Sequence, residues 1–515
     1  MKNMRKIFSV LLTVIVILSL SLTAFATEPE TKTYSITIKN ANSNHTYQVY
    51  QVLTGTIQTD GEGENAKKIL INAAWGDHVK KEYLDDNVYT ASATIAAGNA
   101  SDYVNFVSTP YTAAVSDGSC KITVPKPGYY LVRDVNTSAE ANIEADVYTA
   151  YILVVVEDGN VDVTPKIVKP TVDKQIQDWL LNSDSQKTEK WVDVADYAIN
   201  ESLQFKLTAK LPENDYFAFY DKYKIVFEEN MSAGITFDSI ESVKVGGVSV
   251  EAGVNTDEEK ADNKYYCTAT AGQAGGDWSL TIGDLKKIEG VNLAKGTVVE
   301  VIYNAHLNEN ATVHGAGSNK NTVYLQYSNN PYTDSMGTTV GDSVWVFTYQ
   351  VNNAKTDEKG AALAGAGFKL YTDEACEHEY ELVAIKDANQ NIIGYRPAAS
   401  GEAGVEMVSA ATTGVFNIVG LDQGTYYLKE TTVPAGYNAC ENIEIVISAE
   451  LPDNPDEPLT FDESTKGMTN TIVNQSGIQL PSTGGTGTTL MYIIGGILVF
   501  VAVVFLVTKV KMKQN

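Results

Sequence analysis

The sequence predicts an all-β protein, a rod of tandem immunoglobulin-like β-sandwich domains. Short runs rich in Val, Ile, Thr and Tyr alternate apolar with polar residues, as at 34–38, 151–156 and 203–209. This period of two is typical of strands with one buried face. Gly, Asn and Asp interrupt the runs at short intervals, which is the turn spacing of antiparallel sandwiches. Helical periodicity is limited to 66–85 and 101–107.

The first 26 residues have the pattern of a signal peptide. Basic residues precede an apolar stretch at 7–22, and Ala24-Phe25-Ala26 supplies the small-x-small pattern of a cleavage site. The chain is therefore expected to be exported, with 1–26 removed and the mature protein beginning at Thr27.

The mature region is expected to form three domains, because roughly 450 residues exceed what one hydrophobic core accommodates. Two prolines exclude 163–170 from the centre of a sheet, since proline cannot donate a ladder hydrogen bond. A second junction is predicted at 341–351, after a turn-rich segment. These junctions predict domains at 27–165, 166–345 and 346–475.

The end of the chain, 480–515, combines three features in a fixed order. Leu480-Pro481-Ser482-Thr483-Gly484 is followed by an apolar run at 490–508 and then by lysines. The run is long enough to cross a bilayer as one transmembrane helix, and the lysines are expected to stay in the cytoplasm. This order resembles the cell-wall sorting signal of Gram-positive surface proteins. The resemblance implies that a sortase reads Leu480 and Pro481 and cleaves between Thr483 and Gly484; a plain membrane anchor is the alternative.

Composition and motif content argue against nucleic-acid binding and against enzymatic activity. The formal net charge is −26, and the sequence has no basic stripe, so binding to nucleic acid is not expected. The five histidines are scattered, and neither HExxH nor GxSxG occurs. The sequence therefore predicts a protein that is not an enzyme and that uses no metal or cofactor.

The sharpest internal motif lies in the third predicted domain. The segment 426–437, YYLKETTVPAGY, matches the E-box pattern YxLxETxxPxGY of sortase-assembled pilins. The E-box occurs in Cna-B-type domains, and 354–368 and 471–474 resemble the first and last strands of such a domain. The third domain is therefore expected to be a Cna-B-type sandwich.

This resemblance implies an intramolecular isopeptide bond between Lys355 and Asn474, promoted by Glu430, with the nearby Asn470 as an alternative acceptor. Burial favours the neutral, nucleophilic form of a lysine and raises the pKa of a carboxyl group, which then stays protonated. A protonated Glu430 would polarise the asparagine carboxamide, and attack by the lysine would expel ammonia.

The middle domain resembles the Cna-A-type domains of related pilins through weaker motifs. Lys174 follows the proline-rich linker, where these pilins place a bond-forming lysine, and 227–237 resembles their acid-bearing segment. In the run 319–327, every second residue shares one face, so Asn321 is expected to point inward with apolar neighbours. Glutamate in place of aspartate departs from the commoner pattern. The predicted set is Lys174, Glu229 and Asn321, with Glu228 and Asn319 as alternatives.

Lys166 ends the segment VDVTPK at 161–166, which resembles the pilin motif of backbone pilins, although Thr164 replaces its tyrosine. A lysine after proline at a domain junction is expected to be well exposed. The resemblance implies that Lys166 accepts the next subunit, with Lys169 as the alternative.

Two of the four cysteines, Cys376 and Cys440, lie in the third predicted domain. Related pilins often carry a disulfide there, so the resemblance implies a bond between these two residues. Cys120 and Cys267 fall in different predicted domains and are expected to be unpaired.

Together these features resemble a major, or backbone, pilin of a Gram-positive bacterium. The resemblance implies a pilus shaft at the cell surface, whose identical subunits a pilin-polymerising sortase joins head to tail through Thr483 before transfer to peptidoglycan. Minor pilins and host surface ligands are further expected partners. The alternative is a cell-wall-anchored monomeric adhesin, or a minor tip or base pilin, that binds a host ligand.

Overall fold

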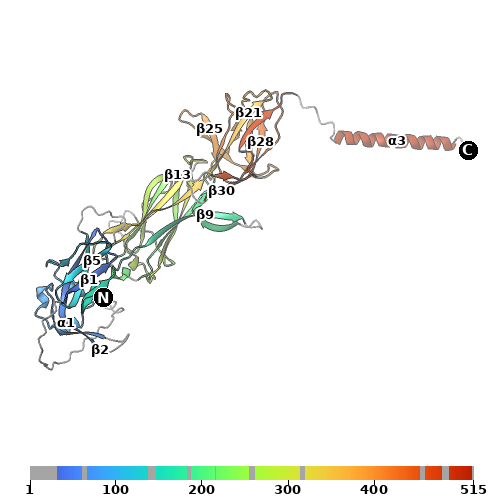
Figure 1. Ribbon diagram of the computed structural model, residues 1–515. Helices are drawn as coiled ribbons and strands as arrows, with labels where there is room; N and C mark the ends of the chain where they lie inside the picture. The colour runs from blue at the N-terminus through green and yellow to red at the C-terminus, as the bar shows by residue number, and fades with distance from the viewer. Residues whose placement is uncertain are drawn as a thin grey trace, which may run out of the picture. The chain divides into compact units, whose positions relative to one another are not determined.

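The computed structural model describes most of the chain between the two targeting signals, together with a C-terminal helix (Figure 1). The predicted signal peptide at 1–26 and the sortase motif at 480–484 lie outside the described residues. The described residues are 32–60, 67–136, 147–181, 187–214, 216–254, 261–313, 319–452, 459–477 and 486–512.

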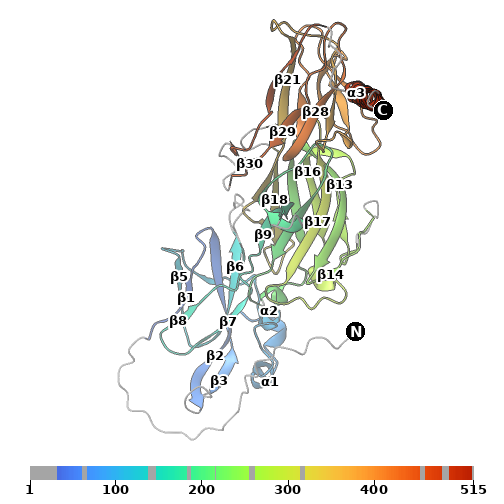
Figure 2. The same ribbon diagram turned by 90° about the vertical axis from the view of Figure 1, so that its right-hand side faces the viewer.

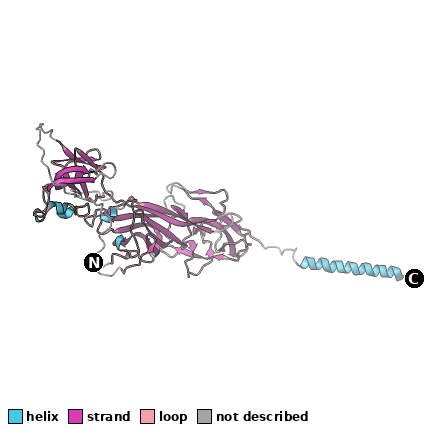
Figure 3. Ribbon diagram, turned by 90° about the horizontal axis from the view of Figure 1, so that it is seen from below, coloured by secondary structure: helices cyan, strands magenta, loops and turns pink. Residues whose placement is uncertain are grey.

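The predicted all-β class is confirmed: strands dominate the described chain, as Figure 3 shows in magenta. Contacts divide the chain into two compact units, one of 1–348 with 451–459 and the other of 349–450 with 460–515. The boundary at 348/349 falls within the junction predicted at 341–351. The division of 27–475 into three domains stays a prediction.

The first part of unit 1 holds two small sheets. One has the strand order β5-β1-β8, and the other has the order β3-β2-β6-β7, with β4 paired to β2. Ile36, Val49 and Ile122, from both sheets, belong to one buried cluster, so the sheets pack against each other. The strands are β1 (Tyr34–Lys39), β2 (His45–Asp60), β3 (Lys67–Trp75), β4 (Tyr111–Thr112), β5 (Ser119–Val124), β6 (Gly128–Asn136), β7 (Ile152–Val156) and β8 (Asn160–Val163).

The helix predicted at 66–85 is wrong for its first half. Residues 67–75 form β3, which pairs antiparallel with β2, and the later part contributes a 3-10 turn at Lys81–Tyr83. Pairing with a long neighbouring strand overrides local helical periodicity here. Two short helices follow, α1 (Val88–Ser92) and α2 (Ala100–Tyr103), and the second overlaps the helix predicted at 101–107.

The second part of unit 1 is built on strands in the order β10-β9-β12-β17-β13-β18-β20-β11, with β14 and β16 on β13, β15 on β16 and β19 on β18 (Figure 2). The strands are β9 (Thr171–Leu181), β10 (Lys187–Val192), β11 (Val194–Asp196), β12 (Ser202–Lys210), β13 (Ile225–Val245), β14 (Val248–Ser249), β15 (Tyr265–Cys267), β16 (Gln273–Ile282), β17 (Val298–Leu307), β18 (Lys320–Ser328), β19 (Met336–Thr338) and β20 (Asp342–Phe347). This part also contains two 3-10 turns, Tyr216–Phe219 and Leu285–Lys287.

The long strand β13 takes part in two layers, because its two halves pair with different strands. Its first half, 225–231, pairs with β16 and β18, whereas its second half, 235–245, pairs with β17 and keeps β16 as a partner only at 236–237. The register shifts between Met231 and Thr236, and an irregularity of this kind bends a strand and re-aims it. The layer of β9, β12 and β17 therefore faces the layer of β16, β18 and the first half of β13 across one core.

Unit 2 is a sandwich of two sheets. One has the order β24-β25-β27-β21-β32, and the other has the order β23-β22-β28-β29, with β26 on β22. The rings of Phe368 and Phe416 stack at 4.4 Å between them. The first strand lies parallel to the last, β32. The strands are β21 (Tyr349–Asp357), β22 (Gly367–Tyr371), β23 (Glu379–Tyr380), β24 (Leu382–Lys386), β25 (Ile392–Pro397), β26 (Met407–Val408), β27 (Ile418–Leu421), β28 (Gly424–Thr432), β29 (Ile443–Ile447), β30 (Ala449–Glu450), β31 (Thr460–Phe461) and β32 (Thr469–Asn474).

The C-terminal helix α3 (Thr486–Met512) covers the apolar run at 490–508, so the helix itself is confirmed. In the part of the chain that the structure describes, however, no helix is long and apolar enough to span a membrane.

Candidate functional site

Unit 2 brings together the three polar side chains that the E-box resemblance singled out. On β28 the period of two turns Tyr426, Leu428 and Glu430 toward the core. On β21 the same alternation buries Lys355, and on β32 it buries Asn474. Lys355 lies opposite Ile472 in the parallel pair, so Asn474 is its neighbour two residues further along. Glu430 comes from the other sheet.

These three side chains form a direct hydrogen-bonded chain. The amine Nζ of Lys355 donates to Oδ1 of Asn474 at 2.6 Å, and Nδ2 of Asn474 donates to Oε1 of Glu430 at 2.7 Å. The backbone N–H of Cys440 donates to the other oxygen of Glu430 at 2.9 Å. The lysine nitrogen thus lies beside the carboxamide that it would attack, and the glutamate lies beside the nitrogen that would leave.

Burial lowers the pKa of Lys355, although the nearby Glu430 and Cys440 partly oppose this shift. A lower pKa favours the neutral amine, which is the nucleophile. The alternative acceptor, Asn470, instead donates to Oδ1 of Asn353 at 2.9 Å and to the carbonyl of Gly467. The structure therefore pairs Lys355 with Asn474.

Unit 1 brings Lys174, Glu229 and Asn321 together in its second part, where all three are buried. Lys174 comes from β9 in one layer, and Glu229 and Asn321 come from β13 and β18 in the other. Nζ of Lys174 donates to Oε2 of Glu229 at 2.5 Å. Asn321 reaches the pair through the hydroxyl of Tyr303 on β17, to which its Nδ2 donates at 2.6 Å. This cluster therefore has four members.

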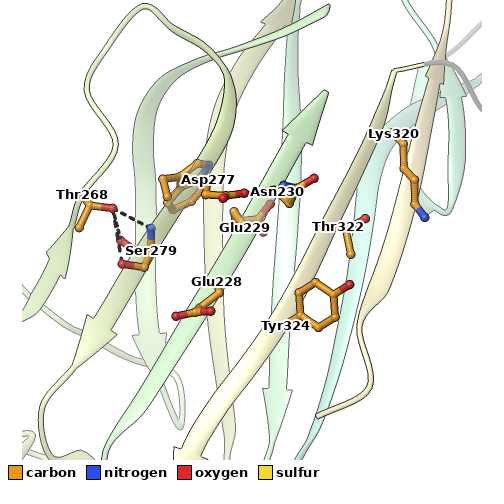
Figure 4. A pocket seen from close by; sticks show the side chains of 10 residues that line it. Glu228, Glu229, Asn230, Thr268, Asp277, Ser279, Lys320, Thr322 and Tyr324 are labelled. Atoms are coloured by element: carbon orange, nitrogen blue, oxygen red, sulfur yellow. Dashed lines mark hydrogen bonds between the residues drawn. The ribbon is translucent and has the colours of Figure 1, made fainter. Parts of the chain in front are cut away.

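The two alternatives in this domain lie elsewhere. Glu228 is only half-buried, whereas Glu229 beside it is buried. Both residues line an open hollow of about 710 Å³ (Figure 4). The carboxamide of Asn319 is occupied by backbone: it donates to the carbonyls of Thr312 and Val346, both at 2.9 Å, and accepts from the N–H of Thr312. Asn319 thus stabilises the backbone at Thr312 and Val346 and is not part of the cluster. The cluster contains Glu229 and Asn321.

Burial shifts both charged members of the cluster in unit 1 toward neutrality. Desolvation lowers the pKa of Lys174 to about 8, although Glu229 and Asp342 oppose the shift. Desolvation also raises the pKa of Glu229, against the effects of Lys174 and Tyr303. A neutral amine beside a neutral acid is the protonation state that amide formation with an asparagine requires.

Sequence reasoning missed Tyr303. It lies in β17, where Val299, Val301, Tyr303, Ala305 and Leu307 alternate inward. A tyrosine on an otherwise apolar inward face needs a buried partner for its hydroxyl, and this was the available signal. The partner could not be identified from the sequence, because Lys174, Glu229 and Asn321 all lie on other strands.

Lys166 is partly buried, which corrects the expectation that it is well exposed. Its backbone N–H donates to Oγ1 of Thr149 at 2.6 Å, and its Nζ lies 5.2 Å from the centre of the Phe219 ring. Burial lowers the pKa of this lysine, so a larger fraction of the amine is neutral at a given pH. Lys169, the alternative, is exposed.

The predicted disulfide between Cys376 and Cys440 is wrong in this structure, in which both residues are free thiols. The two residues are held by different partners. Sγ of Cys376 accepts from Asn442 at 3.3 Å, whereas Cys440 is bound through its backbone to Glu430. Burial, with a smaller contribution from the carboxylate of Glu430, raises the pKa of the Cys440 thiol to about 11, so the thiol stays protonated.

Two family models match the chain. Residues 349–454 match SpaA, a prealbumin-like fold domain, and residues 472–514 match the LPXTG cell wall anchor motif. The second match overlaps the sorting signal that the sequence indicates. The protein is anchored to the Gram-positive cell wall. A comparison with curated proteins gives no match.

Solved structures similar to this chain include three pilus proteins. The T6 backbone pilin of Streptococcus pyogenes is 16% identical, with 87% of this chain and 100% of that chain covered and a TM-score of 0.49. The major pilin SpaD of Corynebacterium diphtheriae is 18% identical, with 87% and 98% covered and a TM-score of 0.45. The pilus protein RrgB of Streptococcus pneumoniae is 15% identical, with 88% and 100% covered and a TM-score of 0.43.

Proposed function

We propose that this protein is the shaft subunit of a covalently polymerised, cell-wall-anchored pilus. The observation that carries the proposal is the presence of two buried clusters, each containing a lysine, a glutamate and an asparagine from strands far apart in the sequence. Buried charges are costly unless they are paired, so their occurrence in two β-sandwich cores needs a functional reason. Covalent bracing of an exported fibre supplies one.

Each brace is an amide formed within the chain. In unit 2, Nζ of Lys355 bonds to Cγ of Asn474, the bond from Cγ to Nδ2 breaks, and the nitrogen leaves as ammonia with a proton from the lysine. Glu430 accepts a hydrogen bond from Nδ2 and can transfer that proton. The new amide joins the first strand of the unit to the last, so pulling on the chain ends cannot peel these strands apart.

The subunits are joined by a second reaction. A sortase thiol displaces Gly484 from the carbonyl of Thr483 and forms a thioester. Nζ of Lys166 from the next subunit then displaces the thiol and forms an amide, and the amine gives up its proton. Donor and acceptor lie at different places on each subunit, so the contact is heterologous and open-ended, which produces fibres. Transfer of the last subunit to peptidoglycan anchors the fibre.

The Thr483→Ala variant tests this function. We expect wild-type protein to give a ladder of high-molecular-weight species on immunoblots of wall extracts, and we expect this variant to abolish the ladder because the acyl donor is altered. The Ser482→Ala variant is the matched control, since it changes the neighbouring residue and keeps the LPxTG pattern. A single wall-anchored band for the wild type would contradict the shaft and favour a monomeric adhesin.

A further inference from the structure

The hydroxyl of Tyr303 lies at the centre of the cluster in unit 1. It is 3.1 Å from Nζ of Lys174, 3.2 Å from Oε2 of Glu229 and 2.6 Å from Nδ2 of Asn321. The lysine and the asparagine donate to it, and it donates to the glutamate. A phenol has one hydrogen and two lone pairs, so these three contacts use its full capacity.

The ring of Tyr303 is fixed by aromatic neighbours. Its centre lies 5.1 Å from that of Phe205 and 5.1 Å from that of Trp278, with the Trp278 ring nearly perpendicular at 88°. Nζ of Lys174 lies over both Phe205 and Tyr303. A closely packed ring holds its hydroxyl in place without further support. The oxygen is therefore positioned before any reaction begins.

Unit 2 has a different arrangement. There Lys355 contacts Asn474 directly, and Asn474 contacts Glu430 directly. In unit 1, the hydrogen bond that the structure gives Nδ2 of Asn321 runs to Tyr303, and Tyr303 in turn contacts Glu229. In unit 2 the asparagine thus contacts the lysine and the glutamate directly, whereas in unit 1 the lysine contacts the glutamate directly and the asparagine is connected to both through a phenol.

Two acceptor atoms of the cluster in unit 1, Oε1 of Glu229 and Oδ1 of Asn321, are buried and have no hydrogen-bond partner among the described residues. Leaving such atoms unpaired is costly. The cluster therefore has more buried acceptor atoms than donors to satisfy them, and a proton on Glu229 turns one of these acceptors into a donor. The geometry thus favours a protonated Glu229, from which a proton can be transferred.

We propose that Tyr303 is a bond-forming residue, whose hydroxyl carries a proton from Glu229 to the nitrogen that leaves Asn321. The proposal rests on the proposed bracing of this domain. Nζ of Lys174 bonds to Cγ of Asn321, which turns the amide nitrogen into a proton acceptor. The hydroxyl then donates its hydrogen to Nδ2 and takes one from Glu229, and Glu229 takes one from the attached lysine nitrogen. The bond from Cγ to Nδ2 breaks, ammonia leaves, and Tyr303 and Glu229 regain their original protonation states.

The test uses the mature chain, 27–483, and measures its intact mass during a pulse-chase, together with the cross-linked peptides. Wild-type protein is expected to lose two molecules of ammonia. Tyr303→Phe keeps the packed ring and removes the hydroxyl, and we expect bond formation between Lys174 and Asn321 to slow by about 100-fold or more, the usual contribution of a positioned acid or base. The bond between Lys355 and Asn474 in the same molecule is the internal control and should form at the normal rate.

Tyr327→Phe is the matched control variant. Tyr327 is buried on β18 in the same part of the unit, and its hydroxyl has no hydrogen-bond partner among the described residues. This variant should lose two molecules of ammonia at the wild-type rate. Tyr303→His provides another proton carrier, so it should form the bond between Lys174 and Asn321 faster than Tyr303→Phe does. This ranking separates proton transfer from a purely structural role, which would leave both variants equally slow.

Two results would overturn the inference in different ways. If Tyr303→Phe forms the bond between Lys174 and Asn321 at the wild-type rate, the proton relay through Tyr303 is excluded, while the proposed amide bond itself still stands. A wild-type protein without the peptide that joins Lys174 to Asn321 would exclude the bracing of this domain, and the relay with it.

Discussion

The Lys166→Arg variant is expected to reach the cell wall as a monomer, without the ladder of polymers. Arginine keeps the positive charge, but its guanidinium is not a usable nucleophile because it stays protonated. Burial lowers the pKa of Lys166, so the wild-type amine has a larger neutral fraction than an ordinary surface lysine. Its reaction with the thioester should accelerate as the pH rises and level off below the usual pKa of lysine. Immunoblots of wall extracts, made over a range of pH, measure both effects.

Lys169→Arg provides the matched control for this experiment. It makes the same change three residues away, on an exposed side chain of the same linker. This variant should form a normal ladder. A ladder in Lys166→Arg that disappears in Lys169→Arg would move the acceptor to Lys169, and a ladder in both would place it on another lysine.

The Glu430→Gln variant is expected to fold without the brace in unit 2 and to unfold at a much lower temperature. Lys355 and Asn474 are 119 residues apart, and a cross-link that closes a loop of this length stabilises by roughly 4–5 kcal/mol in the entropic treatment used for disulfides. For a domain of this size, that corresponds to a decrease in Tm of roughly 10 °C or more. Calorimetry measures the shift, and intact mass should show one retained ammonia.

Glu444→Gln is the control for Glu430→Gln. It makes the same change on β29, next to β28 in the same sheet, at an exposed residue that forms an ion pair with Lys466. Exposed ion pairs contribute little to stability, so the Tm of this variant should stay near that of the wild type. Its intact mass should show the loss of ammonia that accompanies the bond between Lys355 and Asn474. Asn474→Ala removes the electrophile and should match Glu430→Gln in Tm. Loss of ammonia from Glu430→Gln at the wild-type rate would contradict the role of Glu430.

The predicted members of the two clusters differ in how far the sequence could identify them. Glu430 belongs to a motif with fixed spacing along the chain, and period-two alternation places it on a buried face. Lys355 and Asn474 lie in strands that resemble the first and last strands of the same type of domain, and Asn470 remained as an alternative to Asn474. For Glu229 and Asn321, neighbouring residues of the same type remained as alternatives. Burial separates Glu229 from Glu228, and hydrogen bonding separates Asn321 from Asn319, since both asparagines are buried. Glu228 is only half-buried, and the carboxamide of Asn319 is bound to backbone groups of Thr312 and Val346.

Three expectations failed for reasons that act across the fold. Residues 67–75 became a strand because β2 offers them a pairing edge. Lys166 lost exposure because Phe219, more than fifty positions away, packs beneath its amine. The thiols of Cys376 and Cys440 are free because each residue is held by its own neighbours, and presence in one domain does not bring two sulfur atoms into bonding distance.

The sequence by itself determined the all-β class, the wall anchor and the side chains that alternation turns inward, because period and motif spacing are local properties of the chain. The tertiary structure alone decided which inward side chains meet. The bend in β13 sets Glu229 opposite the layer that carries Lys174 and Tyr303, and the parallel pairing of β21 with β32 sets Lys355 beside Asn474. Contacts between layers depend on strand register and on where a strand changes partners, and neither is encoded in the alternation of any one strand.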